Sequence, residues 1–117
     1  MNLLPDILEE AVDGPRATFR LFLPADFVHF AGHFPGQPIL PGVVQLDWAV
    51  RLGKRHFALP RERFSQLKGL KFTSPVLPET TLDLSLHWQA DRQRLEFAYH
   101  AGDRACSSGQ IVFGAAA

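Results

Sequence analysis

The stretch PGVVQLDWAVRLGKRHF, residues 41 to 57, decides the fold because its pattern predicts a helix that is apolar over most of its surface. Two sets of residues recur at helical spacing: Val43, Leu46, Val50, Gly53 and Phe57 on one face, and Val44, Trp48 and Leu52 on a second. Pro41 and Gly42 predict the start of this helix, and Pro60 closes the segment. A helix whose first half is apolar nearly all round is expected to be buried.

Strand patterns flank this helix on both sides. The expected strands are residues 7–12, 16–23, 68–74, 81–89, a segment around 95–99, and 106–113, with hairpin turns at Asp13-Gly14 and Gly102-Asp103. The order of elements predicts an α+β protein in which a curved antiparallel sheet wraps around one long central helix. We expect one domain over residues 1–117.

Composition narrows the class of protein. The formal net charge is zero, which does not favour nucleic-acid binding. No apolar run is long enough for a membrane span, and the start MNLLPDILEE does not resemble a signal peptide. Cys106 is the single cysteine, so no intrachain disulfide can form, and we expect it to pack in or beside a strand. These features suit a cytoplasmic protein.

Basic residues are concentrated between Trp48 and Lys71, where Glu62 is the one acidic residue. The set is Arg51, Lys54, Arg55, Arg61, Arg63, Lys68 and Lys71. It is either a solvated surface without a partner or a docking patch for an anionic partner.

The segment before the helix is the candidate site. Residues 24–42 hold four prolines and three glycines, and a long irregular loop inside a compact domain is usually functional. His33 is a natural general base near neutral pH. The Gly42 N–H, at the positive end of the helix dipole, is a candidate donor to an oxygen that gains negative charge. Asp47 lies in an apolar part of the helix, where lost hydration is expected to raise its pKa and keep it protonated as an acid.

Each of these residues also has an ordinary interpretation. A lone His is usually a surface or hydrogen-bonding residue, and Pro-Gly before a helix is common capping chemistry. Asp47 could pair with Arg51, four residues further along the helix. Gln45 could be a solvated or satisfied polar residue. The functional hypothesis therefore depends on the combination and order of these residues.

The segment HFPGQPILPGVVQLD, residues 33–47, resembles the central motif of the β-hydroxyacyl-acyl-carrier-protein dehydratases, which have the hotdog fold. The fourteen-residue spacing from His33 to Asp47 is the spacing that this family uses. A second segment, LKGLKFTSPVLPETTLDLSL, residues 67–86, resembles the family's strand, Pro turn and following strand. The order of elements matches along nearly the whole chain.

The resemblance implies roles for these residues. His33 would remove the proton next to the thioester carbonyl, Asp47 would protonate the departing 3-hydroxyl, and the Gly42 N–H would hold the thioester oxygen. The implied substrate contacts are Phe34, Pro41, Gln45, Leu46, Val50 and Phe72, the last three residues lining an acyl tunnel. Family members are dimers, so His33 of one chain would face Asp47 of the other.

The implied partner is an acyl carrier protein, or CoA, whose phosphopantetheine arm carries the acyl group. The acidic carrier would dock on the basic set, and no metal or redox cofactor is implied. The saturated fatty-acid branch of the family usually has Glu where this chain has Asp47. Asp at this position leaves open a fatty-acid pathway or a specialised one such as aryl-polyene synthesis. The alternatives are a hotdog acyl-CoA thioesterase and a non-catalytic acyl-binding subunit.

Overall fold

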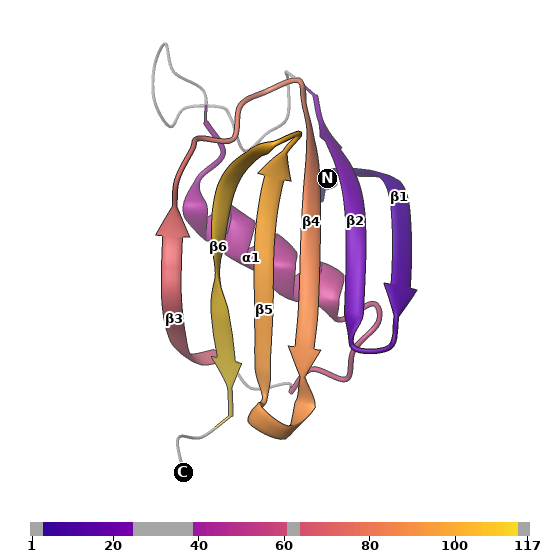
Figure 1. The fold of residues 1–117 in the computed structure, drawn as a ribbon, viewed down its shortest axis with the longest axis vertical. Coiled ribbons are helices and arrows are strands. Elements are labelled where there is room, and N and C mark those ends of the chain that lie inside the picture. The colour runs from indigo at the N-terminus through magenta and orange to yellow at the C-terminus, as the bar shows by residue number, and fades with distance from the viewer. Residues whose placement is uncertain (1–3, 25–38, 61–63, 115–117) are drawn as a thin grey trace.

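The computed structural model describes residues 4–24, 39–60 and 64–114, and in this part of the chain one α-helix lies across one face of an antiparallel sheet (Figure 1). The helix is α1 (Gly42–Gly53). The strands are β1 (Asp6–Asp13), β2 (Arg16–Leu23), β3 (Phe64–Phe72), β4 (Thr80–Gln89), β5 (Arg94–Ala101) and β6 (Arg104–Phe113), and a short 3-10 turn, η2 (Ala90–Arg92), joins β4 to β5. This α+β architecture confirms the predicted order of elements.

The sheet has the strand order β1-β2-β4-β5-β6-β3, and every neighbouring pair is antiparallel. β3 precedes β4 in the chain but lies at the far edge of the sheet, beside β6 (Figure 1). The chain that leaves β2 must therefore cross the sheet to reach β3. α1 is part of this crossing and runs diagonally behind the strands (Figure 1).

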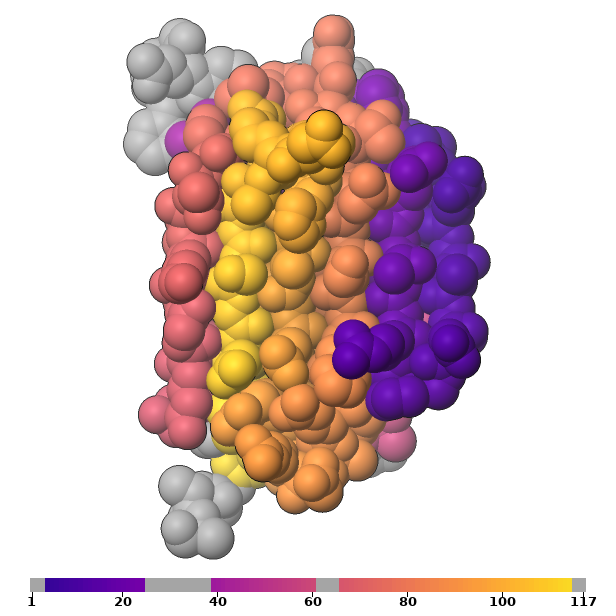
Figure 2. All heavy atoms as spheres, viewed as in Figure 1, coloured from indigo at the N-terminus to yellow at the C-terminus, as the bar shows by residue number. Residues whose placement is uncertain are grey.

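The core lies between α1 and the inner face of the sheet. Alternate residues of the strands point inward, as Phe19 and Leu21 do on β2, and both are buried. The strand register places Phe19 opposite Leu84, and Leu84 opposite Tyr99, so that inward residues form rows across the sheet. The outer face, seen in Figure 2, carries no helix among the described residues.

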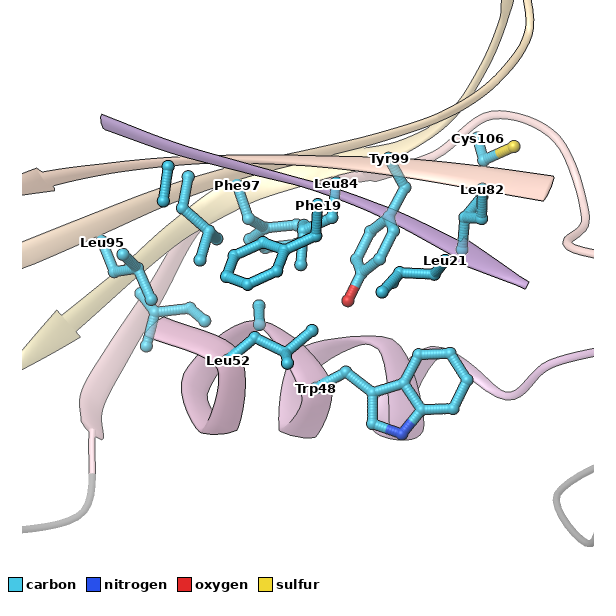
Figure 3. Packing of buried hydrophobic residues seen from close by; sticks show 14 of the residues in the cluster. Phe19, Leu21, Trp48, Leu52, Leu82, Leu84, Leu95, Phe97, Tyr99 and Cys106 are labelled. Carbon is cyan, nitrogen blue, oxygen red and sulfur yellow. The ribbon is translucent and has the colours of Figure 1, made fainter. Parts of the chain in front are cut away.

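α1 buries the face that meets the sheet. Trp48, Ala49 and Leu52 have no exposed surface, and Figure 3 shows Trp48 and Leu52 below the strands. Burial of each large apolar side chain contributes about 1.5–3 kcal/mol. The helix was expected to continue toward Phe57, but it ends at Gly53. The chain then makes tight turns that still bury Phe57.

Gly53, the last residue of α1, lies close to the core. A β-carbon on Gly53 would lie 3.4 Å from side-chain atoms of both Leu59 and Leu95. The chain therefore approaches the sheet closely at this glycine. With twelve residues, α1 falls well short of the length that traverses a bilayer, and it is the longest helix of the described residues.

β3 begins and ends earlier than the 68–74 expected from the sequence. Its register with β6 shifts between Lys68 and Lys71, and Gly69 inside this shift has a φ of 58°. Such a positive φ suits glycine and marks a β-bulge. β3 ends at Phe72 because the N–H groups of the next two residues both donate to the Cys106 carbonyl, at 2.8 and 3.2 Å. Cys106 itself is buried on β6, as predicted.

Candidate active site

A cavity of about 460 Å³ opens where α1 begins, between the helix and the connection from β3 to β4. Its described lining is Ile39, Leu40, Pro41, Gly42, Gln45, Phe72, Thr73, Ser74 and Pro75. Four residues predicted from the sequence, Pro41, Gly42, Gln45 and Phe72, are therefore brought together. Residues 73–75 of the lining lie in the segment 67–86 that resembles the family, but they were not predicted as site residues.

The first turn of α1 lies at the wall of this cavity. Pro41 is the N-cap residue, and no side chain caps the helix. The N–H groups of Val44 and Gln45 donate to the Pro41 carbonyl at 3.1 and 3.3 Å. Within the described residues, the N–H groups of Gly42 and Val43 have no acceptor. Unpaired N–H groups at the positive end of the helix dipole attract an oxygen that carries negative charge.

Phe72 covers the start of the helix. A β-carbon on Gly42 would lie 2.7 Å from the Cζ atom of the Phe72 ring, so the ring packs directly on the glycine. Phe72 is still 52% exposed. Its ring is thus both a wall of the cavity and part of its opening.

Gln45 is buried, and its polar atoms are bonded. Its side-chain Nε2 donates to the Leu40 carbonyl at 3.2 Å, and the Ser107 hydroxyl donates to its Oε1 at 2.6 Å. The Tyr99 hydroxyl donates to the Gln45 backbone carbonyl at 2.6 Å. The ordinary interpretation of Gln45 as a satisfied polar residue is confirmed, although Gln45 also lines the cavity.

Tyr99 and Ser107 were not identified from the sequence. Tyr99 is fully buried on β5, and Figure 3 shows its hydroxyl pointing from the sheet to the helix. Burial raises the pKa of the Tyr99 phenol well above its usual range, and the negative charge of Asp47 raises it further. The phenol therefore stays protonated and acts as a donor. The sequence did carry a signal for them: both are polar residues at strand positions that point inward.

Asp47 does not occupy the desolvated position that was expected. Its side chain is 50% exposed and pairs with Arg51 at 2.8 Å, the alternative considered for it. The cause is the helical register: Gln45, Trp48 and Ala49 face the sheet, which leaves Asp47 on the opposite side of α1. In the single chain, the apolar neighbours of Asp47 along the sequence do not bury it.

The other predicted substrate contacts lie elsewhere. Leu46 and Val50 are partly buried at the edge of the core and are not among the described residues that line the cavity with Phe72. His33 and Phe34 lie outside the described residues.

The basic residues that the structure describes do not form one surface. Arg51 pairs with Asp47, and Arg55 binds both carboxylate oxygens of Glu10 on β1, at 2.8 and 2.9 Å. His56 Nε2 lies 2.5 Å from the same carboxylate. Lys54 follows α1 toward that edge of the sheet, whereas two exposed lysines, Lys68 and Lys71, lie on β3 at the other edge. Arg61 and Arg63 lie outside the described residues.

A larger hollow, of about 650 Å³, lies on the outer face of the sheet (Figure 2). Its lining comes mainly from β4, β5 and β6 and includes the charged or titratable residues Arg16, Lys71, His87 and Glu96. Of the predicted functional residues, its described lining includes Lys71 alone. The cavity at the start of α1 is therefore the better candidate for the site.

Comparisons with known proteins show the family to which the chain is similar. A family model described as ApeI dehydratase matches residues 9–110. The 3-hydroxyacyl-[acyl-carrier-protein] dehydratase FabZ of Roseiflexus sp. (strain RS-1) is 32% identical over 97 residues, which cover 78% of this chain and 68% of that protein.

Two solved structures are similar over nearly the whole length. One is the dehydratase heterocomplex ApeI:P from Xenorhabdus doucetiae, with a TM-score of 0.84 and 34% identity over 92% of this chain and 96% of that chain. The other is an uncharacterized protein from Erwinia carotovora subsp. atroseptica, with a TM-score of 0.79 and 37% identity over 93% of this chain and 94% of that chain.

Proposed function

Because the chain belongs to the ApeI-like dehydratase family, which has the hotdog fold, we propose that it removes water from a (3R)-3-hydroxyacyl thioester on an acyl carrier protein. The product is the trans-2-enoyl thioester. The observation that carries this proposal is the uncapped start of α1, whose Gly42 N–H is unpaired among the described residues beside a cavity. A thioester oxygen held there gains negative charge as the neighbouring carbon loses its proton.

In the proposed mechanism, His33 is the general base that removes this proton. Asp47 is the acid that protonates the departing hydroxyl, so that water leaves. The Gly42 N–H stabilises the enolate oxygen that forms between these events. No metal or redox cofactor is required for this chemistry.

A second copy of the chain completes the proposed site. Val43, at the start of α1, is 72% exposed although it is apolar, and Asp47 on the same helix is half exposed. β3 is an edge strand whose outer side pairs with no described strand. A partner that covers α1 and this edge would desolvate Asp47 and supply the opposing His33. The related ApeI was solved in a heterocomplex, so a different subunit is the alternative partner.

We place the reaction in the cytoplasm, in fatty-acid or aryl-polyene biosynthesis. The acidic carrier docks on the exposed lysines of β3, Lys68 and Lys71, because this strand ends at Phe72 in the wall of the cavity. Its phosphopantetheine arm then reaches the start of α1.

The test is mass spectrometry of products from a panel of 3-hydroxyacyl carrier proteins. We expect the acyl group to lose about 18 mass units, the mass of one water, while the thioester stays intact. His33→Ala and Asp47→Asn should each reduce kcat by about 10²–10⁴-fold. Asp83→Asn is the matched control, because Asp83 is also a partly exposed aspartate paired with an arginine, Arg20, at 3.0 Å.

Two outcomes would contradict the proposal. Release of free thiol without an enoyl product would identify a thioesterase instead. Wild-type dehydration by both His33→Ala and Asp47→Asn would show that the assigned mechanism is wrong.

A further inference from the structure

We propose that Gln45 and Ser107 form a positioning pair that sets the direction of the Gly42 N–H, an inference that depends on the proposed function. Neither side chain touches the reacting atoms in this proposal. Their task is to hold the turn that leads into α1.

The turn is fixed on both sides of one residue. The Leu40 N–H donates to the Val76 carbonyl at 2.8 Å, and the Leu40 carbonyl accepts from Gln45 Nε2 at 3.2 Å. Leu40 is therefore held between the β3–β4 connection and the helix. Because only Pro41 separates Leu40 from Gly42, these bonds restrict the peptide that carries the Gly42 N–H.

Ser107 holds the other end of the Gln45 amide. Its hydroxyl donates to Gln45 Oε1 at 2.6 Å, and the two residues are 5% and 3% exposed. Water has little access to replace this bond. Without the Ser107 hydroxyl, the buried Oε1 would lose its partner, and the amide would be free to turn away from Leu40.

The sheet presents three neighbouring contacts to the same turn of the helix. The register places Phe72 opposite Ser107, and Ser107 opposite Tyr99, in one row across β3, β6 and β5. Phe72 packs on Gly42, Ser107 bonds the Gln45 side chain, and Tyr99 bonds the Gln45 backbone carbonyl. One row of the sheet thus locates the start of α1 at three points, and Figure 3 shows the Tyr99 hydroxyl pointing toward the helix.

This arrangement matters for the proposed chemistry because an oxyanion donor acts only within a narrow range of distance and direction. Loss of one donor costs about 10²–10³-fold in kcat, and small displacements have part of that effect. A displaced Gly42 N–H would reduce stabilisation of the transition state more than it reduces substrate binding. The pair should therefore affect kcat and leave KM nearly unchanged.

The experiment compares Ser107→Ala with Ser108→Ala, the neighbouring serine that lines the hollow on the outer face. Steady-state dehydration and thermal unfolding are measured for both variants. For Ser107→Ala we expect kcat to fall about 10-fold with KM within about twofold of wild type. Ser108→Ala should keep both constants. Ser107→Thr, which retains the hydroxyl, should recover most of kcat.

A purely structural role would lower the unfolding midpoint of Ser107→Ala and leave kcat per folded molecule unchanged, which would overturn the inference. If Asp47→Asn abolishes dehydration while Ser107→Ala retains wild-type kcat, the inference fails and the proposed function stands. If the wild-type protein does not dehydrate any 3-hydroxyacyl carrier, both are overturned.

Discussion

The ring of Phe72 lies so close to Gly42 that a β-carbon on the glycine would come within 2.7 Å of the ring. The strand at the edge of the sheet and the first residue of the helix are therefore packed without space for a side chain. This contact defines the wall of the cavity in which the proposed reaction takes place.

Replacement of Gly42 tests this packing. Gly42→Ala should lower the free energy of unfolding by about 1 kcal/mol, because the exposed ring must move aside. In a Phe72→Ala background the same change should be neutral or stabilising by up to about 1 kcal/mol, since Ala favours helix more than Gly does. Urea unfolding followed by Trp fluorescence measures both values. Equal effects in the two backgrounds would show that the ring does not restrict position 42.

The proposed subunit interface predicts a difference between two exposed apolar residues. Val43 on α1 is 72% exposed, and Leu8 on β1, at the other edge of the sheet, is 54% exposed. Val43→Glu should convert a dimer to a monomer and abolish dehydration, because the charge would be buried against the second chain. Leu8→Glu should do neither. Light scattering after size exclusion measures the mass, and a dimeric Val43→Glu variant would place the interface elsewhere.

Carrier docking on β3 predicts a change in KM that depends on the carrier. The double variant Lys68→Glu with Lys71→Glu should raise KM for the acyl carrier substrate about 10-fold, since it reverses charges that face an acidic partner. KM for a short pantetheine thioester should stay the same. Lys54→Glu, at the opposite edge of the sheet, is the control. An equal rise for both substrates would place the lysines at the cavity instead of at a docking surface.

Glu10 links β1 to the end of α1 and makes stability depend on pH. Hydrogen bonds from Arg55 hold the pKa of Glu10 below its usual value of 4.5. The pair therefore stabilises the fold above about pH 4.5, and this contribution is lost as the pH falls through the lowered pKa of the folded state. At pH 7, Glu10→Gln should lower the unfolding midpoint by about 3 °C.

That difference should shrink as the pH falls below 4.5 and through the lowered pKa of Glu10, because the wild-type carboxylate is then protonated as well. Thermal unfolding monitored by circular dichroism across this range measures it. Glu9→Gln is the control, because Glu9 is 72% exposed and its contact with Arg20 is long, at 3.8 Å. A difference that is constant with pH would exclude the ion pair as its source.

β2 and β4 could be predicted well because each buries one face. Alternation along residues 16–23 and 81–89 specified which side chains point inward, and Gly14 and Gly102 adopt the positive φ that the predicted turns require. The end of the helix could not be predicted. The apolar spacing continues to Phe57, but the helix ends at Gly53, and the turns that follow still bury Phe57.

The candidate site was only partly predictable. Gly42 was identified because Pro-Gly marks a helix start, and the structure begins α1 there. Asp47 was expected to be buried because its neighbours in sequence are apolar, but which side of the helix meets the sheet is decided by the whole fold. The bond between Ser107 and Gln45 joins residues 62 apart and depends on strand register, which no local pattern specifies.

The bulge at Gly69 has a consequence for how molecules of this protein can assemble. An unprotected edge strand offers its backbone to any other strand, and regular edges can add further chains without end. The glycine interrupts β3 with a φ of 58°, so the regular ladder is broken between Lys68 and Lys71. Two copies can meet over a short length of this edge and close as a symmetric pair. A continuous fibre of stacked sheets, by contrast, would have to straighten the bulge in every molecule that it adds.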